Sequence, residues 1–156
     1  MPDDPNPISD PASPQPKRYR PRLEPVDLAV SDIACECYVW PVPRTQAHAG
    51  LIVFSGTYAH GSAGALDALQ IKWRINQLCQ LPPPIGGLVV DLRQLAYEWG
   101  DDLSVEPDKY DLSERLLVVV RPEQVQPFKY PIGASRLRTD IEQAFAEIAD
   151  AVRAKR

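Results

Sequence analysis

The sequence predicts a single α/β domain in which a mixed sheet of four to five strands packs against helices. A proline-rich extended arm, residues 1–26, precedes this domain of residues 27–156. Short apolar runs without alternation, at 88–92 and 116–120, are typical of strands buried on both faces. Residues 139–154 have the apolar spacing of an amphipathic helix. The first 26 residues offer few apolar side chains to a core, which favours an extended arm.

The composition restricts the class of protein. A chain of 156 residues can bury its own core. A net charge of −4 argues against general binding to a nucleic-acid backbone, which needs excess Lys and Arg. Three cysteines, an odd number, do not resemble a secreted disulfide framework. We see no targeting segment and no bilayer-spanning stretch, so we expect a cytoplasmic protein without membrane contact.

The arm is marked by proline and by positive charge. Eight of the 17 prolines fall within the first 25 residues, and residues 17–22 form the basic run KRYRPR. Such a run binds an acidic partner or nucleic acid in some proteins. A solvated tail is the simpler interpretation, and we favour it.

Two strands are predicted next, at residues 33–40 and 51–59, as antiparallel neighbours. In the first, Ile33, Cys35, Cys37 and Val39 share one parity and alternate with Ala34, Glu36, Tyr38 and Trp40, as in a half-buried strand. The Cys-x-Cys pair is an alternative candidate for half of a zinc site. Zinc usually takes four ligands, and no second pair is present, so we expect core cysteines.

A helix is predicted at residues 63–80, with two apolar stripes on nearly opposite sides. One holds Leu66, Leu69 and Trp73, and the other holds Ile71, Ile75, Leu78 and Cys79. Two stripes indicate a helix covered on both sides, by a second copy in a homodimer or by a long loop. Ser62 is expected to be the N-cap. His60 is an alternative general base beside it.

The third strand carries the most informative residues. We expect Leu88–Leu92 to be an interior strand that ends near Asp91 and delivers the acidic loop behind it to the carboxyl edge of the sheet. Ligands of open α/β sheets usually bind at that edge. Residues 93–115 are long enough for a crossover, and residues 121–135 are expected to be a proline-punctuated loop. Thr139 and Glu142 form a capping box for the last helix.

The acidic loop supports two interpretations. An exposed Trp99 beside charges is a common anchor of protein interfaces, with Gly100, Asp101 and Asp102 completing the contact surface. Alternatively, Asp91, Asp101 and Asp102 hold a metal ion and His60 acts as the base of a small hydrolase. The chain contains neither a P-loop nor a dinucleotide-binding motif, so nucleotide chemistry of those classes is not expected.

From Leu51 onward the element order resembles the STAS (anti-sigma-factor antagonist) family. The likeness covers about two-thirds of the chain and rests on LIVFSGTYA, the helix ending at Gln80, LVVDLRQLAYEWGDDL, LLVVV and DIEQAFAEIADAV. It implies a regulatory module. Trp99 and Gly100 stand where the family has its Asp and phosphorylated Ser, so no phosphorylation site carries over. The order is also similar to crotonases, in which the Gly100 backbone would serve an oxyanion.

Since no complete catalytic constellation is present, we expect a non-catalytic interaction or regulatory module without a cofactor. It would bind a protein partner through Trp99, Gly100, Asp101 and Asp102, and dimerisation is a further expectation. The metal-assisted hydrolase is the alternative.

Overall fold

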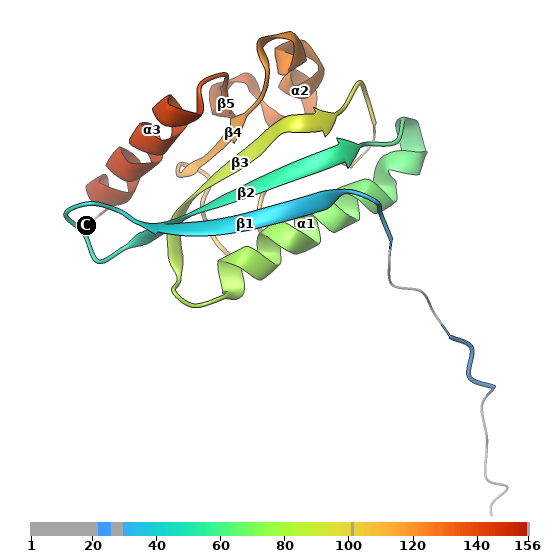
Figure 1. The fold of residues 1–156 in the computed structure, drawn as a ribbon, viewed down its shortest axis with the longest axis horizontal. Coiled ribbons are helices and arrows are strands. Elements are labelled where there is room, and N and C mark those ends of the chain that lie inside the picture. The colour runs from blue at the N-terminus through green and yellow to red at the C-terminus, as the bar shows by residue number, and fades with distance from the viewer. Residues whose placement is uncertain (1–21, 26–29, 101, 156) are drawn as a thin grey trace, which may run out of the picture.

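A computed structural model describes residues 22–25, 30–100 and 102–155. Five strands form one sheet in the order β1-β2-β3-β4-β5, and helices α1, α2 and α3 pack on it (Figure 1). β1 pairs antiparallel with β2, whereas β2, β3, β4 and β5 are parallel. The predicted α/β fold with a mixed sheet is therefore confirmed. Most of the predicted arm lies outside the described residues.

The elements follow the chain as β1 (Ala34–Pro41), β2 (His48–Thr57), the 3-10 turn η1 (Gly61–Gly64), α1 (Ala65–Gln80), β3 (Ile85–Ala96), β4 (Leu116–Val119), η2 (Pro122–Gln124), α2 (Val125–Ile132), η3 (Ala134–Arg136), β5 (Leu137–Arg138) and α3 (Ile141–Ala154). Among the described helices, none combines the length and the apolar character that crossing a bilayer requires.

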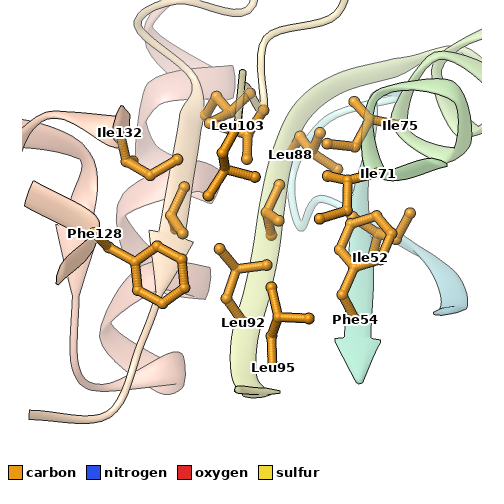
Figure 2. Close-up of a cluster of buried hydrophobic side chains, with 14 of the residues drawn as sticks. Ile52, Phe54, Ile71, Ile75, Leu88, Leu92, Leu95, Leu103, Phe128 and Ile132 are labelled. Carbon is orange, nitrogen blue, oxygen red and sulfur yellow. The ribbon is translucent and has the colours of Figure 1, made fainter. Parts of the chain in front are cut away.

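The sheet has a core on each face because side chains of the inner strands alternate between two apolar layers. Leu88, Val90 and Leu92 of β3 pack with α1 and α2, as Figure 2 shows for part of this cluster. Val89 of the same strand packs with Ile148 of α3 on the other face. Burial on both faces explains the uninterrupted apolar runs at residues 88–90 of β3 and 116–119 of β4.

β3 is interior, as predicted, but it is longer than the sequence indicated. It continues to Ala96, five residues beyond Asp91, and pairs with β2 as far as Thr57. The predicted end of the strand at Leu92 was therefore wrong. The polar residues within 91–96 lie inside a paired strand because the backbone ladder, and not side-chain polarity, determines where pairing stops.

Only one of the two apolar stripes of α1 reaches the core. Ile71, Ile75, Leu78 and Cys79 are buried. Leu66, Leu69 and Trp73 are 53%, 54% and 46% exposed, so the described part of the chain does not cover the second stripe.

The predicted N-caps of α1 and α3 were both wrong. α1 begins at Ala65 after a 3-10 turn that includes Ser62, and its N-cap is Gly64 without a side-chain bond. For α3 the capping side chain is Asp140 and not Thr139, because the Asp140 carboxylate accepts from the backbone nitrogens of Glu142 and Gln143.

The segment predicted as a proline-punctuated loop contains α2. Pro127 occupies the third helical position, where a backbone N–H has no partner within the helix. Pro131 lies in the last turn before Gly133 ends the helix. Phe128 and Ile132, four residues apart, are buried against the sheet.

β1 is an edge strand, and only one of its two cysteines packs against the core as we expected, namely Cys35. Cys35 is half-buried and Cys37 is exposed. Although the Cys37 residue is exposed, nearby protein atoms desolvate its thiol, and this desolvation, together with neighbouring Cys35, raises the pKa of the thiol to about 11. Burial raises the pKa of Cys79 to about 11 as well. Both thiols are therefore protonated at neutral pH and are poor nucleophiles.

Candidate functional site

The carboxyl ends of β2 and β3 place residues 58–62 beside residues 97–100. Thr57 pairs with Ala96 at the end of the ladder. The Tyr58 backbone N–H then donates to the Ala96 carbonyl at 2.9 Å. Two segments far apart in sequence therefore meet at the edge where open α/β sheets bind ligands.

An aromatic stack joins residues 58–62 and 97–100 to the core below them. The Tyr58 and Tyr97 rings meet edge to face with centroids 5.1 Å apart. Tyr97 also stacks on Phe128 of α2 at 4.6 Å. The Tyr97 hydroxyl donates to the Gly100 carbonyl at 3.3 Å, which ties the loop to the buried ring below it.

Asp67 of α1 holds the segment of residues 58–62 in place. Its carboxylate accepts from the Ala59 backbone N–H at 2.7 Å and from the Ser31 hydroxyl at 2.5 Å. The residue is 8% exposed, so these bonds satisfy a carboxylate that has little water around it. Sequence reasoning missed this residue, and its signal was an acidic residue within the first turn of a helix.

Two glycines allow the segments to approach each other. A Cβ on Gly100 would lie 2.5 Å from the Tyr58 Cε1 atom. Gly61 has a φ of +58°, and a Cβ there would lie 2.9 Å from the Trp99 indole. Gly61 is thus favoured both by its left-handed backbone and by the contact with Trp99.

Trp99 lies flat over this platform and faces solvent. Its ring stacks on His60 with centroids 5.8 Å apart and an interplanar angle of 21°. The side chain is nevertheless 58% exposed. The His60 Nε2 atom lies 3.3 Å from a Glu98 carboxylate oxygen, which restrains the imidazole under the indole. We call His60, Glu98, Trp99, Gly100 and Asp102 the Trp99 surface.

Of the two predicted acidic residues that follow Gly100, the structure describes Asp102. Asp102 is exposed, with a φ of +66°, a left-handed conformation that Asp tolerates better than most residues. Leu103 and Val105 follow it into the core and anchor the loop's far end. Asp101 lies outside the described residues.

Asp91 lies apart from the Trp99 surface. It is 2% exposed, in the interior of β3. Its carboxylate accepts three bonds from Arg93: from the backbone N–H and Nε at 3.0 Å each, and from Nη2 at 2.7 Å. These bonds, together with the charges of Asp91 and Asp140, raise the pKa of Arg93.

Among the residues of the hydrolase alternative that the structure describes, Asp91 is therefore not brought together with His60 and Asp102. Asp91 belongs to an internal ion pair on the α3 face of the sheet, whereas His60 and Asp102 belong to loops beyond the strand ends. Within residues 22–25, 30–100 and 102–155, no cluster of three or more His, Cys, Asp or Glu side chains is placed to hold a metal ion.

No family model, curated protein or solved structure matches this chain in the three comparisons. The resemblance to STAS domains stays a prediction that rests on the order of elements.

Proposed function

We propose that the chain is a non-catalytic protein-interaction or regulatory module that binds a protein partner through the Trp99 surface. The observation that carries this proposal is an indole that is 58% exposed and yet fixed by stacking on His60. Exposed aromatic side chains of this kind supply much of the binding energy of protein interfaces.

The fixed geometry favours binding because little conformational freedom remains to be lost. Below the indole, Gly61 and His60 form a platform, and the Tyr58–Tyr97–Phe128 stack joins that platform to the core. An anchor that is already in place avoids part of the entropic cost of ordering an interface.

The charges around Trp99 indicate the chemistry of the partner. Glu98 and Asp102 are exposed on either side of the Trp99–Gly100 pair. A complementary surface would offer an apolar pocket for the indole with Lys or Arg at its rim. Opposite charges at the rim steer association and select the partner more than they add affinity.

We also propose that the chain associates with itself as a homodimer, through the uncovered stripe of α1. Leu66, Leu69 and Trp73 are each about half exposed, and Trp73 carries the Arg74 guanidinium 5.6 Å above its ring. Burial of this stripe between two copies would remove a contiguous apolar surface from water.

Two tryptophan variants test the proposals separately. Immobilised wild type, Trp99→Ala and Trp73→Ala are compared in the capture of proteins from the cells that produce the chain, with quantitative mass spectrometry. Loss of a central anchor costs about 2 kcal/mol or more, which is about 30-fold in Kd. We expect a protein that wild type and Trp73→Ala retain equally and that Trp99→Ala loses.

The same proteins give the oligomeric state by sedimentation. Trp73→Ala is expected to weaken self-association and Trp99→Ala to leave it unchanged. If Trp99→Ala retains every captured protein at wild-type levels, the Trp99 surface is not the partner site.

A further inference from the structure

A second aromatic surface lies on the α3 face of the sheet. Helix α3 packs mainly on β3 and β4, so β1 and the adjoining part of β2 extend beyond it (Figure 1). The hollow beside α3 has a volume of about 510 Å³. We call it the aromatic groove, and it is lined by Tyr38, Trp40, Pro41, Pro43, Leu51 and Phe145.

The lining of the groove has a specific chemistry. Trp40 of β1 and Phe145 of α3 meet edge to face, with centroids 5.1 Å apart. Tyr38 is 51% exposed. Grooves lined by aromatic rings bind proline-rich segments, because a polyproline II helix presents rigid pyrrolidine rings and loses little entropy on binding.

We propose that the aromatic groove binds residues 11–21 of the same chain, PASPQPKRYRP. This segment, which lies outside the described residues, has prolines at 11, 14, 16 and 21 and basic residues at 17, 18 and 20. It therefore combines the ring chemistry that fits the groove with a block of positive charge.

Negative charge lies at one end of the groove. Glu36 stands two residues before Tyr38 on the same side of β1, and its carboxylate accepts a 2.7 Å bond from the Tyr38 hydroxyl. Glu142 is exposed on α3, one turn before Phe145. The two carboxylates complement the basic residues 17–20.

The chain before β1 is held on the α1 side of the sheet, where the Ser31 hydroxyl donates to Asp67, so the arm would pass around the edge strand β1 to reach the groove. The ten peptide steps from Pro21 to Ser31 can span about 33 Å when extended, more than the length of an eight-residue strand. The basic residues are closer in sequence to β1 than residues 11–16 are. They would reach the Glu36 end, and the prolines would continue over Trp40 toward Pro43.

Fluorine NMR of the full-length chain labelled with 5-fluorotryptophan tests the proposal. The chain has three tryptophans, and only Trp40 lines the groove. We expect a triple alanine change at prolines 11, 14 and 16 to shift the Trp40 resonance. The Trp73 and Trp99 resonances should stay in place, which also reports an intact fold.

Charge variants give an independent readout of the same contact. Glu36→Lys should shift the Trp40 resonance toward the position seen after the proline changes. Glu114→Lys is the matched control, because this exposed glutamate precedes β4 and does not line the groove. It should leave the Trp40 resonance unchanged.

Three results would overturn the proposal. One is a Trp40 resonance that ignores the proline changes. Another is an equal shift of all three resonances, which would indicate altered folding. The third is a Trp40 resonance that depends on protein concentration but not on the prolines, which would make a second copy the occupant of the groove.

Discussion

Gly100→Ala tests whether the contact between the two loop segments supports the Trp99 surface. The new Cβ would lie 2.5 Å from Tyr58 Cε1 and 3.1 Å from the Ala59 carbonyl oxygen. Carbon atoms in contact normally stand about 3.5–4.0 Å apart, so the overlap with the ring is about 1 Å. Tyr58 cannot retreat easily, because it is 1% exposed and packs on Tyr97.

Overpacking of this kind costs about 1–3 kcal/mol. Since 1 kcal/mol corresponds to roughly 2–4 °C in a domain of this size, the melting temperature should fall by about 2–12 °C. Urea unfolding followed by circular dichroism measures the loss of free energy. Partner capture should weaken as well, because the clash would displace Gly100 and with it the adjoining Trp99.

A double-mutant cycle identifies the cause of this loss. Tyr58→Leu removes the Cε1 atom that the new Cβ would meet. In that background Gly100→Ala should cost clearly less than in wild type, because the two changes are coupled, and the remaining cost is the contact with the Ala59 carbonyl oxygen. An equal loss of stability in both backgrounds would refute the steric explanation.

Three further predictions concern other parts of the molecule. Asp140→Ala should cost about 0.5–2 kcal/mol in urea unfolding, and Thr139→Ala much less, because the Asp140 carboxylate caps α3; equal losses would contradict this. Hydrogen bonds from Arg138 lower the pKa of Glu147, so this carboxylate stabilises the fold above its unfolded pKa of about 4.3 and stops doing so as the pH falls through its lowered folded pKa. Glu147→Gln should accordingly be less stable than wild type at pH 7, and the difference should shrink toward pH 3; a constant difference would argue against linkage. Because Arg93 occupies the Asp91 carboxylate, Mg²⁺, Mn²⁺ or Zn²⁺ should leave the melting temperature unchanged, whereas a clear rise would return the hydrolase to consideration.

The apolar patterns of the sequence determine most of the fold. Residues 88–92 and 116–120 could be recognised as interior strands because each face of the sheet carries a helix layer, which requires apolar side chains on both sides. The spacing of Ile141, Phe145, Ile148 and Val152 likewise predicted α3.

The sequence was less informative where local signals conflict with packing. Proline is usually a loop signal, and it concealed α2. The buried pair Phe128 and Ile132, at helical spacing, was the contrary signal. The tertiary contact decided the outcome, since Phe128 completes the stack under Tyr97.

Asp91 shows why an acidic residue is a poor marker of a strand end. Asp91 and Arg93 are two residues apart, so their side chains leave the strand on the same face and pair there. That alternation was visible in the sequence, but the carboxyl-terminal extension of β3 to Ala96 was not. The loop that holds Trp99 consequently begins four residues later than expected, away from Asp91.

The two aromatic surfaces can be tested independently because the sheet separates them. Trp99 follows the carboxyl end of β3, while Trp40 pairs with Ala49 near the amino end of β2. The strands between the two surfaces are hydrogen-bonded to each other and largely buried. We therefore expect a local change at one end of the sheet to leave the other end unchanged. If Trp99→Ala moved the fluorine resonance of Trp40, the two surfaces would be coupled through the sheet, and a single conformational change would have to explain both.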